Sequence, residues 1–261
     1  MLAKERQKKI EKALAESGAV LVSELVDRFG VSIETVRRDL LTMEAEGKLV
    51  RVHGGAVVKG DTAPPLSFAE RHRAREAEKE MLAKEAAKLV FDGEVIGIDE
   101  GSTAIAFAKA LKERLRRLTV VTHSLYVFDA LEGQPGFHVI LLGGSYRPDS
   151  RSLVGDLTVQ NLHGMHLEKA FIFPSGVSLD FGVSSHSEEL LQVQRAMIRS
   201  ADEAFVLADS SKFEKKALFK LCDMSSPLTF VTDAGLSQEL RALYKENGVK
   251  VYIGGNSDGA K

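Results

Sequence analysis

The sequence has little of what secreted, metal-stabilised or membrane proteins rely on. Its 261 residues include one cysteine, Cys222, no tryptophan and six prolines. A single cysteine cannot form an internal disulfide, so we expect Cys222 to fill space in a protein of the reducing cytoplasm. No apolar stretch approaches the roughly 18 residues of a membrane span, and the charged start MLAKERQKKIEKAL is unlike a signal peptide. We expect no metal, no cofactor and no membrane partner.

Two nucleotide-binding fingerprints are also missing. Neither G-x-G-x-x-G nor G-x-x-x-x-G-K-[ST] occurs, which argues against a dinucleotide or a nucleoside triphosphate as ligand. The formal net charge of −2 does not by itself predict a polyanion partner. Residues 1–60, however, hold 11 lysines and arginines against nine acidic residues, a charge of +2 that leaves −4 for the rest. A small DNA-binding module joined to an acidic domain fits this asymmetry.

Length and composition predict two domains of unequal size. With 44% hydrophobic residues the chain can bury a sizeable core. The stretch KGDTAPPLS interrupts helical and strand periodicity, which is typical of a linker. We therefore predict a DNA-binding domain over residues 1–58, a linker over 59–67 and an α/β domain over 68–261. The second domain should open with one charged helix from Phe68 to about Phe91, with Met81 and Leu82 towards its apolar side.

Residues 23–46 have the pattern of a helix-turn-helix. Ser23 is a candidate N-cap for a short helix, which Gly30 can end because glycine tolerates left-handed backbone angles. Ser32 can cap a second helix. The apolar stripe of that helix should contain Ile33, Val36, Leu40 and Met43, while Glu34, Thr35, Arg37 and Arg38 point elsewhere.

A short basic hairpin follows this second helix. Gly47 can stop the helix, residues 48–53 alternate as a strand, and Gly54 and Gly55 turn the chain into a second strand over residues 56–58. Helix-turn-helix and hairpin together predict a winged helix-turn-helix. Paired arginines on a helix surface are ordinarily just a solvated face, but this context favours contact with DNA. The predicted DNA-binding residues are Ser32, Glu34, Thr35, Arg37, Arg38, Arg51, His53 and Gly54.

Beyond residue 92, short β-branched runs alternate with helical segments. Strands are predicted near residues 94–98, 118–122, 138–142, 169–173, 204–208, 229–232 and 249–253, and their order predicts a largely parallel sheet covered by helices. Ligands of such sheets bind beyond the carboxyl ends of the strands. Polar loops follow several strands there, one of them directly before a helix start that could bind an anion. The predicted effector-binding residues are Asp99, Glu100, Gly101, Ser102, Thr103, His123, Ser124, Gly143, Gly144, Arg147, Ser175, Gly176, Asp209 and Lys212.

The sequence resembles the DeoR-type bacterial transcriptional regulators. In the first sixty residues the match consists of Glu5 and Arg6 ahead of Ile10, Val31-Ser32-x-x-Thr35-Val36-Arg37-Arg38-Asp39-Leu40, and Gly47-x-Leu49-x-Arg51-x-His53-Gly54-Gly55-Ala56. It continues with a Phe-x-x-Arg at 68–71, Asp-x-Gly-Ser-Thr at 99–103, Val-Val-Thr-x-Ser at 120–124, Leu-Leu-Gly-Gly at 141–144 and Leu-Ala-Asp-Ser-Ser-Lys-Phe at 207–213. The resemblance implies a sensor domain with a fold similar to ribose-5-phosphate isomerase and a phosphorylated sugar as effector.

Two positions depart from the family pattern, which usually has Asn where His123 stands and Asp where Lys169 stands. His123 could donate to a phosphate or respond to pH, although a neutral loop histidine is the simpler interpretation. Taken together, we predict a non-enzymatic repressor of a sugar catabolism operon that binds double-stranded operator DNA as a homodimer or homotetramer. The alternative is a sugar-phosphate isomerase or deaminase with an appended DNA-binding module, using Asp99 or Glu100 as base and Lys212 as helper.

Overall fold

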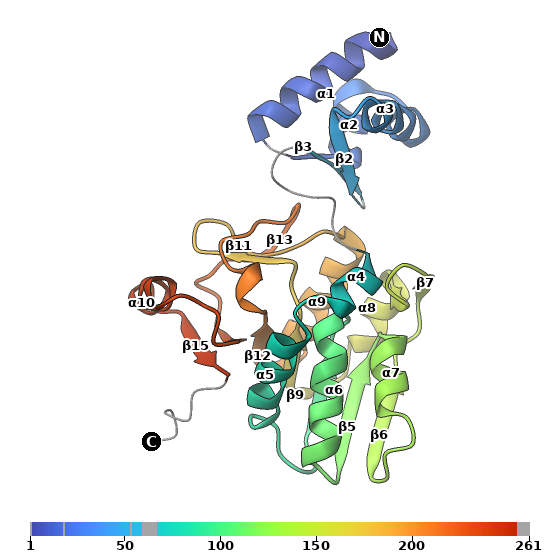
Figure 1. The fold of residues 1–261 in the computed structure, drawn as a ribbon. Helices are drawn as coiled ribbons and strands as arrows, with labels where there is room; N and C mark the ends of the chain where they lie inside the picture. Colours follow the sequence, from blue (N-terminus) through green and yellow to red (C-terminus); the bar gives the residue numbers. More distant parts are fainter. Residues whose placement is uncertain (1, 18, 53, 59–66, 255–261) are drawn as a thin grey trace. The chain divides into compact units, whose positions relative to one another are not determined.

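The computed structural model describes residues 2–17, 19–52, 54–58 and 67–254. The chain divides into two compact units, residues 1–66 with 186–188, and residues 67–185 with 189–261. Figure 1 draws most of the first unit in blue and the second in teal to red. The predicted wing residue His53 and the predicted linker residues 59–66 lie outside the described residues. Within the described ranges, no helix combines the length and the apolar character needed to cross a lipid bilayer.

The smaller unit contains three helices and a three-stranded antiparallel sheet. The helices are α1 (Ala3–Ser17), α2 (Val22–Phe29) and α3 (Ile33–Ala45). The strands β1 (Ala19–Leu21), β2 (Leu49–Val52) and β3 (Gly55–Val58) pair in the order β1-β3-β2. The hairpin of β2 and β3 confirms the predicted wing, whereas β1 was not predicted. A small core joins helices and sheet, and includes Ile10, Leu14, Val20, Leu25, Val36, Leu40, Met43, Leu49 and Ala56.

Local signals explain the end of α2 and the start of α3, whereas two other predictions for this unit are wrong. Gly30 is left-handed (φ 62°) and closes α2, and the Ser32 hydroxyl accepts the Thr35 N–H to cap α3, both as predicted. The prediction for Ser23 is wrong, because α2 begins at Val22, directly after β1, and has no side-chain cap. Ile33 was predicted to be in the apolar stripe but is 45% exposed, because it lies in the first turn of α3, beyond the core.

The larger unit is built on a seven-stranded sheet in which every pair of neighbouring strands is parallel. The strand order is β15-β14-β12-β9-β4-β5-β6. All seven predicted strands are present. They are β4 (Val95–Ile98), β5 (Leu118–Thr122), β6 (Phe137–Leu141), β9 (Leu167–Ile172), β12 (Ala201–Leu207), β14 (Leu228–Thr232) and β15 (Lys250–Ile253).

Helices cover both faces of this sheet (Figure 1). One face carries α5 (Glu76–Ala87), α6 (Ser102–Arg114) and α7 (Leu125–Leu131), and α8 (Asp156–Leu162) and α9 (Glu188–Arg199) lie behind it. Phe107 of α6 packs on Phe171 of β9, which stacks on Phe205 of β12. The remaining elements are α4 (Phe68–Arg73), α10 (Gln238–Glu246), the 3-10 turn η1 (Ser210–Lys212), β7 (Ser145–Arg147), β8 (Ser152–Val154), β10 (Gly176–Ser178), β11 (Gly182–Ser185) and β13 (Phe219–Cys222).

The predicted single helix from Phe68 to about Phe91 is wrong. The chain forms α4 and α5, which are separated by an extended Ala74 (ψ 135°) and a left-handed Arg75 (φ 53°). Met81 is 37% exposed, although Leu82, the next residue, is fully buried, so the apolar face of α5 does not include Met81.

Candidate functional site

The exposed face of α3 is polar and carries the predicted DNA-binding arginines. Arg37 and Arg38 are both exposed. Arg37 makes a 3.3 Å ion pair with Glu34, one turn earlier, and both side chains are more than half exposed. The guanidinium of Arg38 has no hydrogen bond or ion pair with another described residue. Since a surface pair of this kind contributes little to stability, both arginines are available to an anionic partner.

The wing contacts the last turn of α3 through one acidic side chain, Glu44. The Arg51 N–H donates to the Glu44 carboxylate (2.8 Å), and the Arg51 guanidinium lies 3.9 Å from the same group. Gly54 has φ 84°, and its carbonyl accepts the N–H of Val22 (2.9 Å). These contacts hold the turn end of the hairpin and leave the Arg51 side chain partly exposed.

A buried ion pair joins α1 to α3, and sequence reasoning did not include it among the functional residues. Arg6 of α1 is 6% exposed and Asp39 of α3 is 4% exposed, and the guanidinium bonds the carboxylate. Gln7 adds a weaker contact to Asp39 (3.4 Å). The only sequence signal was that both residues belong to the family motif. The pair sets the orientation of α3 on α1, and so the face that α3 presents.

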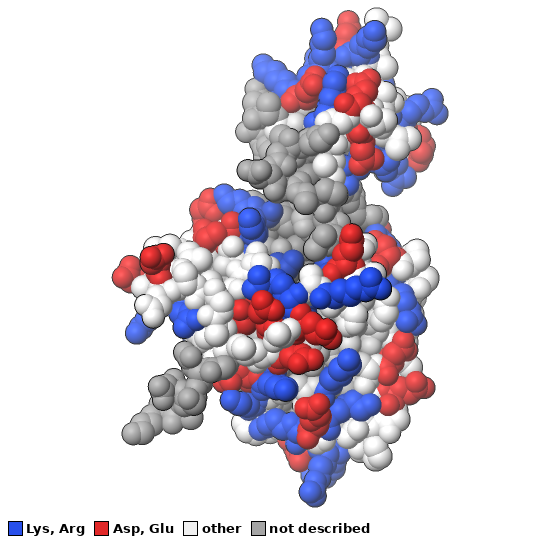
Figure 2. Space-filling model, in the orientation of Figure 1, with Lys and Arg blue, Asp and Glu red and all other residues white. Residues whose placement is uncertain are grey.

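The distribution of surface charge does not indicate which face would contact DNA. In Figure 2, Lys and Arg side chains are interspersed with Asp and Glu over the visible faces of both units, without a large area of one sign. A contact to DNA therefore depends on the placement of particular arginines rather than on net charge.

Asp99 and His123, at the carboxyl ends of β4 and β5, form a buried pair. The Asp99 carboxylate accepts from His123 Nε2 (3.0 Å), the Phe173 N–H (3.1 Å) and Gln194 Nε2 (2.7 Å). His123 Nδ1 lies 2.9 Å from the Leu153 carbonyl, so neither ring nitrogen is left for a phosphate. Burial lowers the pKa of His123, but the hydrogen bond and the charge of Asp99 outweigh it and hold the pKa above its usual 6.5.

Glu100, which follows Asp99, is buried but incompletely bonded. It is 7% exposed, and its Oε2 atom has no hydrogen-bond partner among the described residues. Burial raises the pKa of Glu100, and the nearby His123 opposes that rise only in part. A buried oxygen without a partner is costly, and a ligand hydroxyl or amine could satisfy it.

Lys212 and Arg71 are two cations that act on each other near the loop after β12. Lys212 belongs to η1, after β12, and Arg71 belongs to α4; neither side chain makes an ion pair with any residue in the described part of the chain. Burial lowers the pKa of Lys212; Asp209 opposes this shift and Arg71 adds to it. Burial raises the pKa of Glu100 and the charge of Arg71 opposes that rise, so Arg71 lies near the loop after β4 as well as the loop after β12. Arg71 was missing from the predicted set, although its Phe-x-x-Arg motif was recognised.

Asp209 and Arg75 link the same loop to the start of α5. Asp209 is 3% exposed, accepts the Ser211 N–H (3.0 Å) and pairs with Arg75 Nε (3.1 Å). Asp209 is therefore already engaged within the protein, and it contributes to a ligand site mainly by positioning its neighbours.

Several other predicted residues have their polar groups used inside the fold. The N–H and carbonyl of Gly143 bond Asn161 (2.8 Å) and Thr158 (2.8 Å). Strand β6 lies four positions from β12, about 19 Å at the usual strand spacing, so this loop and Lys212 cannot hold the same phosphate. Gly144 lies in the same loop as Gly143, and the Ser124 hydroxyl caps α7. Arg147 forms ion pairs with Glu189 and Asp149. The Ser175 N–H donates to the Ser184 carbonyl, and the Gly176 backbone packs against that of Lys215.

Gly101, Ser102 and Thr103 form the start of α6, as predicted. Ser102 and Thr103 are each 8% exposed, and the Gly101 N-cap supplies no side chain, which leaves the first amides of α6 without a side-chain acceptor. Lys169, the second departure from the family pattern, pairs with Glu94 instead and lies over the ring of Phe91. Its role is therefore structural.

Comparison with known proteins covers nearly the whole chain. Residues 6–62 match the family model of the DeoR-like helix-turn-helix domain, and residues 74–234 match that of the DeoR C terminal sensor domain. The chain is 34% identical over 251 residues to the uncharacterized HTH-type transcriptional regulator YulB of Bacillus subtilis, with 96% of each chain covered.

Two further relatives have names that state a function. The lactose phosphotransferase system repressor of Lactococcus lactis is 33% identical, with 90% of this chain and 93% of the relative covered. The L-fucose operon activator of Haemophilus influenzae is 30% identical, with 91% and 95% covered. Among solved structures, ribose 5-phosphate isomerase A of Methanocaldococcus jannaschii matches 54% of this chain and 55% of its own at 24% identity, with a TM-score of 0.40. A likeness at that level carries no argument about function.

Proposed function

This chain belongs to the DeoR family of transcriptional regulators, and on that premise we propose that it represses a sugar catabolism operon under control of a phosphorylated sugar. A regulator of chromosomal operators acts in the cytoplasm. The relatives that are named for a sugar system, a lactose repressor and an L-fucose operon activator, support a carbohydrate operon as the target.

One observation carries the choice of a phosphorylated effector: the charge of Arg71 acts on Lys212, and neither side chain makes an ion pair with a residue in the described chain, although Asp209 lies near Lys212. Two neighbouring cations repel each other, and a phosphate dianion bound between them attracts both. The first amides of α6, next to Glu100, add a positive dipole end at the neighbouring loop. Glu100 Oε2 is then placed to bond a sugar hydroxyl.

The DNA-binding half of the proposal rests on α3 and the wing. Arg37 and Arg38 are proposed to contact bases and phosphates of the major groove, with Ser32, Glu34 and Thr35 beside them, and Arg51 and Gly54 to hold the backbone from the wing. A single module of this size makes few base contacts. We therefore infer a homodimer or homotetramer on a palindromic or repeated operator.

A thermal-shift series tests the effector. The protein is titrated with ribose 5-phosphate, glucose 6-phosphate, galactose 6-phosphate, fructose 1-phosphate and glucosamine 6-phosphate, and with each compound lacking its phosphate. We expect at least one phosphorylated member to raise Tm with concentration, as binding to the folded state requires, and its unphosphorylated partner to have no effect. Equal shifts with both partners would contradict a phosphate site.

The same incubations test the enzyme alternative. An isomerase or deaminase would convert one of these compounds, which chromatography of the mixture detects. We expect stabilisation without turnover. The alternative is not favoured, because the matching relatives are named as transcriptional regulators and the Asp99 carboxylate is already bonded to three groups of the protein.

A further inference from the structure

The break between α4 and α5 has no cause in the local sequence. Neither Ala74 nor Arg75 is a helix breaker, and both residue types favour the helix interior. Arg75 nevertheless has φ 53°, a conformation that residues other than glycine seldom adopt. The break must therefore be imposed by contacts made elsewhere in the unit.

Those contacts come from the loops after β12 and β14. Arg75 Nη2 donates to the Ser210 hydroxyl (2.8 Å), and Arg75 Nε lies 3.1 Å from the Asp209 carboxylate. The Ser210 N–H and hydroxyl both donate to Asp233 (2.5 and 3.1 Å), and Asp209 and Asp233 are 3% and 1% exposed. The guanidinium thus docks on two buried carboxylates and one serine that the sheet holds in place.

A lysine satisfies the carbonyls that the break releases. Lys79 Nζ donates to the carbonyls of Arg71 and Ala74, the latter at 2.5 Å, and its side chain is buried. The joint between α4 and α5 is consequently a defined structure with its own hydrogen bonds, rather than a frayed helix end.

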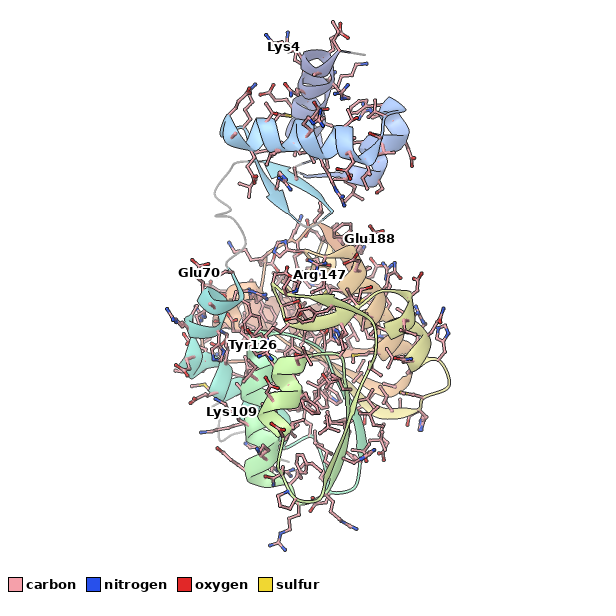
Figure 3. The ribbon with its side chains drawn as sticks, turned by 90° about the vertical axis from the view of Figure 1, so that its right-hand side faces the viewer. Lys4, Glu70, Lys109, Tyr126, Arg147 and Glu188 are labelled. Carbon is pink, nitrogen blue, oxygen red and sulfur yellow. The ribbon has the colours of Figure 1, made fainter. Side chains whose placement is uncertain are left out.

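The other end of α4 rests on an apolar contact. Phe68 stacks on Tyr126 of α7, with 4.2 Å between the ring centres and 8° between the planes. In Figure 3 the labels Glu70 and Tyr126 mark α4 and this part of α7. Arg71 lies between these two contacts. A pull on its guanidinium therefore acts on a six-residue helix that Arg75 holds by ion pairs at one end and that a ring stack contacts at the other.

We propose that Arg75 is a positioning residue that fixes the pivot of α4, so that a phosphate held by Arg71 and Lys212 moves α4 relative to η1. This rests on the proposed function. Asp209, Ser210 and Lys212 lie within four residues of one another in one short loop, so the pivot and one phosphate contact share the same base. The other contact, Arg71, is on the moving element. In sequence, α4 is preceded only by Ser67 and residues 59–66, which lead directly to the unit that contains α3. This covalent connection is the proposed route from α4 to the DNA-binding unit.

The test measures how strongly a ligand changes operator affinity in three variants. Arg75→Ala removes the guanidinium and keeps the Cβ that disfavours the left-handed backbone; Arg75→Gly removes the guanidinium and makes that backbone conformation easy to adopt. Arg73→Ala is the matched control, since this exposed arginine in the same helix makes no ion pair with a described residue. Operator affinity is measured with and without the phosphorylated sugar that stabilises the wild type most in the series above, and ligand affinity by calorimetry.

The expected result separates binding from coupling. The wild type and Arg73→Ala should show a ligand-induced change in operator affinity within the range typical of allosteric coupling, about 5- to 150-fold. Both Arg75 variants should bind the sugar phosphate nearly as tightly as the wild type. The sugar phosphate should nevertheless change their operator affinity less than twofold, which is clearly below the roughly 5-fold or larger change expected for the wild type. Amide exchange at Arg71 and Ala74 should be faster in both variants.

Two outcomes would overturn the proposal, and they can be told apart from failure of the proposed function. Arg75→Gly with full coupling and unchanged amide exchange would show that the backbone bend alone suffices. Loss of ligand binding in both Arg75 variants would make Arg75 part of the binding site instead of a pivot. If no compound stabilises the wild type, the effector assignment itself fails, and unchanged amide exchange in the variants would then reject the pivot independently.

Discussion

Replacing Lys212 by methionine should move two measured quantities in opposite directions. The side chain is partly buried, has a lowered pKa and lacks an anionic partner among the described residues. Its ammonium group is thus unfavourable in the free protein and favourable only when an anion is bound. Methionine keeps the length of the side chain and removes the charge. We expect Lys212→Met to stabilise the free protein and to weaken the binding of a phosphorylated sugar.

The magnitudes follow from the groups involved. A hydrogen bond to a charged group contributes about 1.5–3 kcal/mol, so losing one contact to phosphate should weaken binding about 10- to 150-fold. Removing an unfavourable charge typically adds about 0.5–2 kcal/mol of stability. For a unit of this size each kcal/mol corresponds to about 2–4 °C in Tm. The free variant should therefore melt a few degrees higher than the wild type.

The dependence on pH gives the comparison a second readout. Because the pKa of Lys212 in the folded state is below its ordinary 10.5, the penalty for its charge is complete at neutral pH. It disappears as pH rises through the lowered pKa towards 10.5. The difference in Tm between variant and wild type should shrink over that range.

Thermal melts of the free proteins and calorimetric titrations provide both numbers, with Lys215→Met as control because Lys215 is exposed three residues further on. A variant that is less stable than the wild type and still binds the sugar phosphate normally would refute the reasoning. That result would mean that Lys212 has a structural partner and no ligand.

Three further predictions concern the other buried and exposed charges. Arg37→Ala should cost about 1–3 kcal/mol in operator binding if Arg37 contacts a base, with sugar-phosphate binding intact; the reverse pattern in titrations of both ligands would exclude the assignment. Asp39→Ala should destabilise the smaller unit by about 3–5 kcal/mol, because it removes a buried carboxylate that bonds the buried Arg6 guanidinium, and urea unfolding of the variant measures this. His123→Asn should flatten the pH dependence of Tm above pH 6.5. With its raised pKa, protonated His123 stabilises the wild type fully below 6.5 and progressively less as pH rises through that pKa. Equal slopes for His123→Asn and the wild type would show that the pair with Asp99 does not titrate there.

The main sheet could be predicted from the sequence because its central strands are largely buried on both faces. Runs such as Leu118–Thr122 and Leu167–Ile172 combine β-branched residues with polar breaks, and parallel pairing needs no precise turn between them. The short antiparallel strands β10, β11 and β13 were not predicted. Each has three or four residues, and their pairing joins positions up to about forty residues apart, so no local pattern indicates them.

The candidate site was predicted less well than the sheet, for a related reason. Loops at strand ends can be located once the strands are known, and Asp99, His123 and Lys212 were found in this way. Arg71 lies on a helix that reaches the site from another part of the chain. Its position depends on the bend at Arg75, which is imposed by tertiary contacts with Asp209 and Ser210. No propensity of residues 68–91 indicates that bend.

The two faces of α3, one buried and one exposed, differ in how freely their residues can be replaced during evolution. The face that docks on the rest of the module uses Asp39 and apolar side chains, whereas Glu34, Arg37 and Arg38 are exposed and support nothing inside the protein. Exchanges at exposed positions usually change folding free energy by less than about 0.5 kcal/mol. If these side chains read the operator, as proposed, a new operator preference can arise by replacing two or three of them, while the scaffold that presents them remains as stable as before.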